Sequence, residues 1–209
     1  RRGRVYGPLD LTLEPGSVTL LTGGAGTGKT SVLLTLAGRL RPNAGCELVV
    51  LGHRLPRQAR AVQHRSAVTG VAGLDGLDEE VTVAATIRER EAWLAPWFRI
   101  VRTPNDERVG EVCRDVFGDA PLPTARQLIH ELDEAANLQL RIALALLSNP
   151  ELVVVDDIDQ LRDIEGRRRV WESLRHLSER GITVVASASS PGELSRLGWR
   201  NLPDHVALP

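Results

Sequence analysis

The segment from Gly23 to Thr30 reads GGAGTGKT, and it contains Lys29, the only lysine of the chain. The chain has 26 lysines and arginines together, and every one of them except Lys29 is an arginine. A loop with this glycine–lysine–threonine spacing can surround phosphate groups with its backbone N–H groups when a strand precedes it and a helix follows. The lysine ammonium then reaches the β- and γ-phosphates of a nucleotide. Because a guanidinium is wider and planar, the retained lysine indicates a tight phosphate site.

A carboxylate follows the apolar segment LVVVDD, which spans residues 152–157. A nucleotide site of this kind needs such a group at the end of a neighbouring strand to hold the magnesium shell, and Asp156 has that position. The hydroxyl of Thr30 is the second candidate ligand of Mg²⁺. The glycine loop could alternatively be a turn without a ligand, and Asp156 could belong to a solvated acidic turn. Both alternatives fit less well, because a phosphate loop predicts a strand followed by aspartate later in the chain, and that segment is present. The predicted nucleotide contacts are Gly23, Gly24, Ala25, Gly26, Thr27, Gly28, Lys29, Thr30 and Ser31.

The elements that must position these residues follow from hydrophobic patterning. Two short strands are predicted before the loop, at LDLTL (9–13) and SVTLLT (17–22). A helix is predicted from about residue 29, and its apolar face consists of Val32, Leu33, Leu36 and Leu40. Further strands are predicted at 46–52, 66–72, 151–157 and 181–189, with a helix at 164–180.

Residues 83–147 have helical periodicity, interrupted by four prolines at positions 96, 104, 121 and 123. We interpret this stretch as a helical subdomain inserted into a core subdomain of residues 1–82 and 148–209, together one domain of residues 1–209. Apolar strands that alternate with helices are typical of a parallel sheet covered on both faces. The predicted fold class is therefore α/β: a P-loop NTPase with a mostly parallel sheet flanked by helices, the inserted helical subdomain, and an antiparallel N-terminal strand region.

Composition excludes several classes of protein. The 209 residues are 42% hydrophobic and 25% charged with a net charge of −1, which gives no electrostatic reason to expect nucleic acid as a partner. The two cysteines, Cys46 and Cys113, lack metal-ligand spacing and indicate a reduced compartment. No apolar run approaches the roughly 18 residues of a membrane span. The chain contains no methionine, and we expect it to be processed or part of a longer product.

Three segments of the chain resemble the nucleotide-binding domain of the ATP-binding cassette (ABC) ATPases. They are LDLTLEPGSVTLLTGGAGTGKTSVLLTLAGRLRPNAGCELVVLG, then LRIALALLSNPELVVVDDID, and finally GITVVASAS. The resemblance implies ATP and Mg²⁺ as cofactors and a head-to-tail pair of domains that encloses two ATP molecules. It further implies that each site joins the phosphate loop of one subunit to a signature segment of the other, and that closure moves an integral membrane protein.

The sequence departs from the family at several functional positions. The family signature LSGGQ aligns with LDEAA, residues 132–136, so that Asp133 and Glu134 would face and repel a phosphate. In the alternative interpretation Asp133 only caps the following helix. The glutamate that the family uses as general base aligns with Asp157, one methylene shorter, and its switch histidine aligns with Ser189. Lys29 and Asp157 are thus the candidate catalytic residues, and Ser189 is a candidate γ-phosphate contact.

Two further positions of the family have no clear equivalent. The loop glutamine is absent between residues 68 and 77, and the adenine-stacking aromatic residue would precede Arg1, with Tyr6 an outside candidate. Asp163 aligns with the aspartate that the family uses for communication between its two sites. Outside these motifs, we favour a core position for the cluster Trp93, Leu94, Trp97 and Phe98 over an interface anchor, and a solvated face for Arg167, Arg168 and Arg169.

The first functional hypothesis is an ATP-binding subunit of an ABC-type membrane complex, at the inner face of the cell membrane through an integral membrane partner. It would act as an ATPase with weak or partner-dependent turnover, and a second ABC-type subunit would complete a homo- or heterodimer. The second hypothesis is a catalytically degenerate, ATP-dependent switch or regulatory module. One form of it is a heterodimer in which the other ABC subunit is competent. A soluble ABC-like protein acting on DNA or ribosomes is disfavoured by the near-neutral charge.

Overall fold

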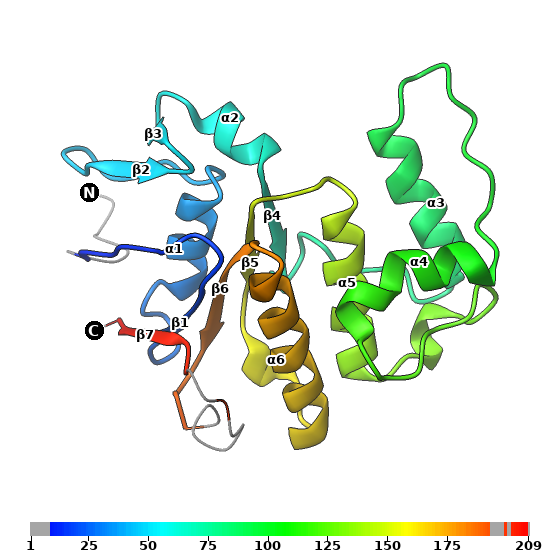
Figure 1. The fold of residues 1–209 in the computed structure, drawn as a ribbon. Coiled ribbons are helices and arrows are strands. Elements are labelled where there is room, and N and C mark those ends of the chain that lie inside the picture. The colour runs from blue at the N-terminus through cyan, green and yellow to red at the C-terminus, as the bar shows by residue number, and fades with distance from the viewer. Residues whose placement is uncertain (1–8, 193–198, 200–201, 209) are drawn as a thin grey trace.

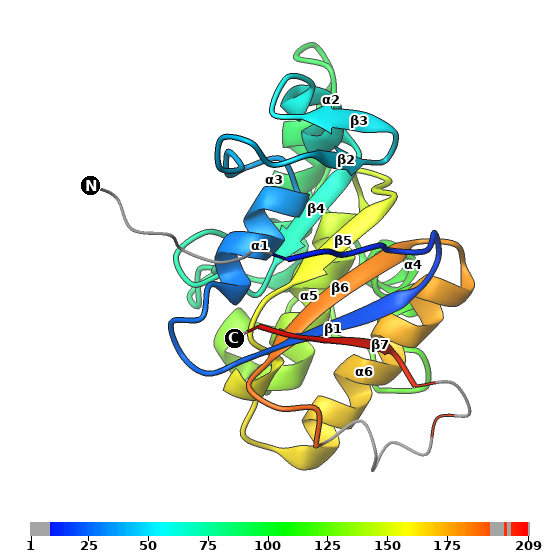
Figure 2. The ribbon, with the colours of Figure 1, turned by 90° about the vertical axis from the view of Figure 1, so that its left-hand side faces the viewer.

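A five-stranded parallel sheet forms the centre of the molecule. The computed structural model describes residues 9–192, 199 and 202–208. The strands are β1 (Val18–Thr22), β4 (Ser66–Thr69), β5 (Leu152–Val155), β6 (Thr183–Ala188) and β7 (Asp204–Ala207). Their order across the sheet is β4-β5-β6-β1-β7, and each neighbouring pair is parallel (Figure 2). The carboxyl ends of these strands therefore meet at one edge, where loops from different parts of the sequence come together.

Helices cover both faces of the sheet (Figure 1). One face carries α1 (Lys29–Leu36), α2 (Ala59–His64) and the antiparallel pair β2 (Leu48–Val50) and β3 (His53–Leu55). The other carries α3 (Val83–Leu94), α4 (Asp106–Phe117), α5 (Glu134–Leu146) and α6 (Ile164–Glu179). Short 3-10 turns occur at Ile129–Glu131 and Ile158–Gln160. Successive strand residues such as Leu20 and Leu21 enter opposite cores because side chains alternate along a strand.

The predicted fold class is confirmed, with the antiparallel element formed by β2 and β3. Residues 9–13 are not a strand, which corrects our expectation. Their alternation is real, since Leu9, Leu11 and Leu13 pack partly against the α1-side core. However, both this segment and β2 line a cavity of about 1180 Å³, and β2 pairs with β3 and not with residues 9–13. Leu40 lies beyond the end of α1 and is exposed, and β3 and β7 were not predicted.

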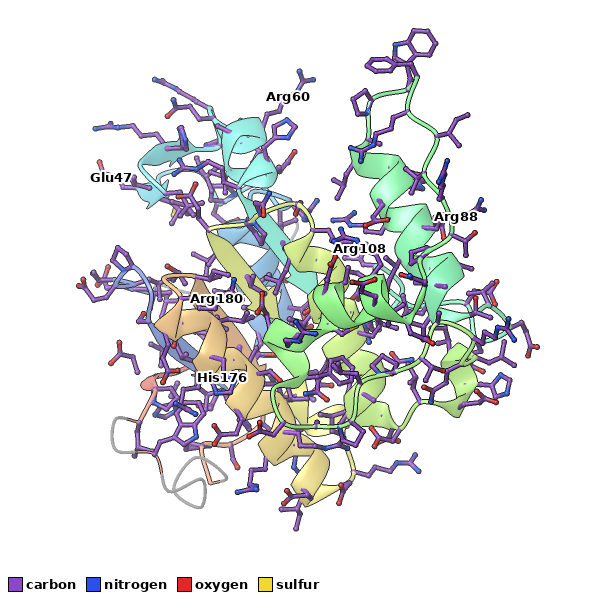
Figure 3. The ribbon with its side chains drawn as sticks, turned by 45° about the vertical axis from the view of Figure 1, so that its right-hand side comes forward. Glu47, Arg60, Arg88, Arg108, His176 and Arg180 are labelled. Atoms are coloured by element: carbon purple, nitrogen blue, oxygen red, sulfur yellow. The ribbon has the colours of Figure 1, made fainter. Side chains whose placement is uncertain are left out.

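The cluster around Pro96 is exposed, so its predicted core position is wrong. Pro96 ends α3, because the residue before a proline is driven out of the helical conformation, and Ala95 is extended. The next residues form a tight turn, in which the Arg99 N–H donates to the Pro96 carbonyl at 2.9 Å. We call Trp93, Trp97, Phe98 and Ile100 the apolar tip; their exposed fractions are 80%, 95%, 71% and 91%. Figure 3 shows aromatic rings at the far end of the loop between α3 and α4.

A close backbone approach at Gly70 makes that position sensitive to any side chain. Gly70 has φ +80°, and an added Cβ would lie 2.3 Å from the backbone oxygen of Asp156. Gly73 has nearly the same φ, +77°, but open space around it. We expect Gly70→Ala to lower the free energy of unfolding by more than about 3 kcal/mol, and Gly73→Ala by only about 1 kcal/mol. Urea unfolding of both variants checks this; equal losses would mean that the strained φ alone matters.

Among the described residues, none of the helices combines the length and apolarity needed to cross a bilayer. The longest, α6, has 16 residues and carries charged side chains along its exposed face. Its buried residues Val170, Trp171, Leu174 and Leu177 belong to the core on the far side of the sheet from α1. The helix predicted for residues 164–180 is therefore present, with one buried face.

Candidate functional site

The loop between β1 and α1 has the backbone geometry that its glycines permit. Gly26 and Gly28 have φ values of +83° and +93°, which L-residues rarely adopt. Nothing lies within 4 Å of the positions where Gly24 or Gly26 would carry a Cβ, so there is open space beside both residues. The side chain of Thr27 closes the turn by donating to the Gly24 carbonyl at 3.0 Å. The loop is therefore held in one shape while its backbone stays accessible to a ligand.

Lys29 begins α1 and its side chain folds back over the loop. The ammonium donates to the carbonyl of Gly23 at 2.6 Å and to that of Gly24 at 3.0 Å. This holds a positive charge at the N-terminus of a helix, where the helix dipole adds to it. Ala25 is exposed within the same loop, and Ser31 is half-buried in the first turn of α1. All nine loop residues predicted from the sequence thus lie in one continuous strand–loop–helix unit.

Asp156 lies beside this unit, directly after β5. It is 6% exposed, and its two carboxylate oxygens accept from two hydroxyls, Thr30 at 2.5 Å and Ser187 at 2.6 Å. Its backbone N–H donates to the Thr69 carbonyl of β4 at 2.9 Å. The two residues predicted to hold Mg²⁺, 126 positions apart in the sequence, are therefore in direct contact. A hydroxyl beside a carboxylate is a donor set of hard oxygens that suits Mg²⁺.

Ser187 is a site residue that the sequence analysis did not single out. It is fully buried within β6, and its hydroxyl donates to Asp156 and accepts from the backbone N–H of Asp157 at 2.8 Å. A polar residue inside the apolar segment TVVASA was the signal available, because a buried hydroxyl requires partners. Ser187 therefore fixes both aspartates to the neighbouring strand.

Asp157 has a left-handed backbone conformation, with φ 50° and ψ 62°, and its side chain is exposed. Desolvation raises the pKa of its carboxyl above the ordinary aspartate value, and the negative charges of Asp156 and Asp159 raise it further. Lys29 opposes this shift. A raised pKa makes Asp157 a better proton acceptor than an isolated aspartate, which is the property that a general base needs.

The same shift predicts a pH-dependent stability. Because folding raises the pKa of Asp157, the ionised carboxylate costs stability above its folded pKa, and this cost disappears below the unfolded pKa of about 3.9. Asp157→Asn should therefore stabilise the protein at neutral pH, with a gain that shrinks as the pH falls. Urea midpoints measured from neutral to acidic pH check this; a gain independent of pH would mean that charge is not the cause.

Ser189 follows β6, and it forms hydrogen bonds with Asp159. Its hydroxyl and its backbone N–H both donate to one carboxylate oxygen of Asp159. Asp159 stands two residues beyond Asp157 in the turn after β5. The structure thus brings Ser189 to the same edge of the sheet as Asp156 and Asp157, but its hydroxyl is already used by a carboxylate.

The segment aligned with the signature has internal partners for both of its acidic residues. Asp133 is the N-cap of α5, accepts from the Ala136 N–H at 2.7 Å, and pairs with Arg169 at 2.7 Å. Desolvation would raise the pKa of Asp133, but these two contacts outweigh it and lower the pKa below its usual value. Glu134 accepts from the backbone N–H of Arg162 at 3.0 Å. The capping role predicted for Asp133 is therefore present, together with an ion pair.

The loop after β4, where the family glutamine has no counterpart, is fixed by an ion pair. Asp75 accepts from the Gly70 N–H at 2.9 Å and from the guanidinium of Arg141 at 2.5 and 2.8 Å. Both side chains are largely buried, which makes this two-point contact stronger than a surface pair. Asp163 caps α6 through the Gly166 N–H. Tyr6 lies outside the described residues.

A glycine loop between strand and helix, a lysine above it, and a carboxylate held by its threonine define a nucleotide-binding P-loop protein. The sequence profile of the family described as ABC transporter matches residues 6–160. This chain therefore belongs to the ABC transporter family.

Several curated relatives are named as bacterial export ATP-binding proteins. The Nod factor export ATP-binding protein I of Rhizobium etli is 30% identical over 194 residues, which cover 92% of this chain and 58% of the relative. The protein of the same name from Burkholderia pseudomallei is 31% identical over 193 residues, covering 92% of this chain and 60% of the relative. The chain thus spans less than two thirds of the length of these relatives.

Solved structures share the fold at low sequence identity. CbiO1 from Clostridium perfringens, described as part of the ABC transporter complex CbiONQ, has a TM-score of 0.76 with 16% identity, covering 98% of this chain and 78% of that one. A dimeric bacterial ABC transporter cassette has a TM-score of 0.68 with 17% identity, covering 95% and 83% of the two chains. These similarities establish the architecture, and the function must be argued from the site.

Proposed function

We propose that this chain is the ATP-binding subunit of an ABC-type membrane complex and couples ATP binding to a conformational change of an integral membrane partner. The observation that carries the proposal is the contact between Thr30 and Asp156 beside the lysine-bearing loop. The family assignment and the export function in the names of the relatives support it. In this proposal the chain works at the inner face of the cell membrane, with residues 83–147 as the helical subdomain of a single domain.

The roles of the site residues follow from their chemistry. The backbone of residues 23–28 and the ammonium of Lys29 would bind the ATP phosphates, with Thr30 and Ser31 at the helix N-terminus. Thr30 and Asp156 would hold Mg²⁺, whose charge offsets that of the phosphates. In the structure Lys29 bonds to its own loop, so that phosphate oxygens would replace carbonyl oxygens as its partners.

Hydrolysis would be weaker than binding. Asp157 has the raised pKa that a base needs, but its carboxylate is one methylene shorter than the family glutamate, and a displacement of about 1 Å can lower a rate about a hundredfold. Ser189 offers no positive charge, and its hydroxyl is bound to Asp159. The proposed activity is therefore slow ATP hydrolysis, and the alternative is an ATP-dependent switch that opens by nucleotide release.

The segment at Asp133 and Glu134 favours a heterodimer over a homodimer. The contacts with Ala136 and Arg169 lower the pKa of Asp133, so that this residue stays ionised where the family brings a phosphate. Two copies of this chain would each present that carboxylate to the ATP of the other. A second ABC-type subunit with a competent signature would instead complete the site formed by Lys29 and Asp156.

The test compares nucleotide binding and steady-state hydrolysis for the chain alone and with its native partner subunits. We expect ATP binding by the chain alone, and hydrolysis that rises at least about tenfold when a subunit with an intact signature is added. Asp157→Asn should then abolish hydrolysis and leave binding intact, whereas retained hydrolysis would remove Asp157 from the mechanism. Binding without hydrolysis under every condition would establish the switch, and absence of ATP binding would refute both hypotheses.

A further inference from the structure

The apolar tip has no role in the nucleotide site. Its members are Trp93 at the end of α3 and Trp97, Phe98 and Ile100 in the loop that follows, and all four are strongly exposed. Trp97 and Phe98 contact each other edge to face, with ring centroids 5.9 Å apart. Exposed aromatic and aliphatic side chains that gather in this way mark an interaction surface, because their burial in a partner removes unfavourable contact with water.

The charge around the apolar tip is one-sided. Residues 92–105 contain two charged side chains, Arg99 and Arg102, and no acidic residue. Both arginines are exposed, and neither forms an ion pair with any described residue. Farther down α3 there are two acidic residues: Glu89, which is exposed and lies one helical turn before Trp93, and Glu91, which pairs with Arg108 at 2.7 Å. The surface thus combines large apolar side chains with unpaired positive charge.

The shape of this surface favours a deformable partner, such as a lipid surface, over a folded protein. The tip projects from the body of the molecule at the end of the loop between α3 and α4 (Figure 3). Among the described residues, neither the cavity beside residues 9–13 and β2 nor the one beside α2 is lined by residues 93–102. Tryptophan and arginine are the side chains that favour the boundary between lipid headgroups and acyl chains, since each has an apolar body and a polar end.

We infer that the apolar tip inserts into an anionic lipid surface, with Trp97 and Phe98 at the level of the acyl chains and with Arg99 and Arg102 bound to the headgroup phosphates. The partner is the bilayer itself, and no membrane protein is required for this contact. Aromatic burial and two positive charges supply the two signals that stable attachment to a membrane surface needs. The inference goes beyond the proposed function, because the contact needs no nucleotide.

Vesicle sedimentation tests the inference with the purified chain. We expect binding to vesicles of phosphatidylcholine mixed with phosphatidylglycerol, and much weaker binding to phosphatidylcholine alone. Trp97→Ala/Phe98→Ala should reduce the binding at least about tenfold. Leu74→Ala/Ile164→Ala, which removes two other exposed apolar side chains, should leave it unchanged. Equal loss in both double variants, or no binding by the unchanged chain, would overturn the inference.

Two double variants that remove the same number of positive charges test how the arginines contribute to vesicle binding. Each arginine near an anionic surface contributes about fivefold in affinity. Arg99→Ala/Arg102→Ala should therefore weaken binding to the anionic vesicles more than about tenfold. Arg57→Ala/Arg60→Ala removes the same charge from an exposed region before and within α2 and should have little effect. Equal effects of the two pairs would mean that net charge alone matters, and the inference would fail.

Tryptophan fluorescence and assembly with the native membrane complex distinguish insertion into lipid from binding to a protein. Trp93→Phe/Trp97→Phe should retain binding but lose the blue shift of tryptophan emission that vesicles induce in the unchanged chain. The two remaining tryptophans do not reach the lipid, because Trp171 is buried and Trp199 packs partly buried against the same core. Tip variants that bind vesicles normally but no longer join the native membrane complex would assign the surface to a protein and overturn the lipid inference. ATP binding is measured for each variant as well, so that a failure of the proposed function can be distinguished from a failure of the lipid inference.

Discussion

Lys29→Met should lower the affinity for ATP about ten- to a hundredfold. The methionine side chain is unbranched and nearly as long as lysine, but it lacks the charged ammonium that donates to the carbonyls of Gly23 and Gly24. A hydrogen bond to a charged group contributes about 1.5–3 kcal/mol, and about 1.4 kcal/mol corresponds to a tenfold change in affinity. Titration calorimetry with ATP measures the effect.

The control for Lys29→Met is Arg41→Met, which removes a positive charge from an exposed side chain beyond the end of α1. It should leave ATP affinity within about twofold, since exposed charges are screened by salt. Lys29→Arg gives a second comparison, because it keeps the charge but presents a wider, planar group. Wild-type affinity in Lys29→Arg would show that charge alone is required and would contradict our explanation of the single lysine.

Asp156→Asn should remove the dependence of ATP affinity on Mg²⁺. The aspartate is buried, and its oxygens accept from the hydroxyls of Thr30 and Ser187. An asparagine carries no charge and turns one of these acceptors into a donor, so that it is a poor ligand for a hard cation. In the unchanged protein Mg²⁺ should strengthen ATP binding at least about tenfold, the effect of about 1.4 kcal/mol of charge interaction.

Binding measured with Mg²⁺ and with a chelator gives the comparison for each variant. Asp10→Asn, at an exposed aspartate outside the site, should keep the full dependence on Mg²⁺. Unfolding in urea controls for the buried substitution, since a loss of fold would abolish binding under both conditions. If Asp156→Asn retains the dependence on Mg²⁺ of the unchanged protein, Asp156 is not a ligand of the metal.

Much of the fold was predictable because its signals are local. The run VTLLT of β1, the glycine loop and the apolar face of α1 lie within about 20 consecutive residues, so that periodicity and spacing were enough. The position of Asp156 was predictable for a different reason. A carboxylate after a buried parallel strand must lie at the same edge of the sheet as the loop after β1.

The failures of prediction concern contacts between distant residues. Whether residues 9–13 pair with β2 depends on the distance between two segments, and hydrophobic alternation carries no information about it. The exposure of Trp97 depends on where the loop between α3 and α4 lies relative to the core, and the sequence shows only that its residues are apolar. Ser187 was missed because one serine in a strand does not reveal its partners.

The contacts of Asp133 and Glu134 explain why this signature segment would not easily return to the family sequence. Asp133→Ser would keep a helix cap but lose the ion pair with Arg169, and Glu134→Gly would release the Arg162 N–H and place a poor helix former in the first turn of α5. Each step lowers stability before it improves a phosphate site. A change of this segment to the family sequence would therefore need compensating changes around Arg162 and at Arg169 of α6.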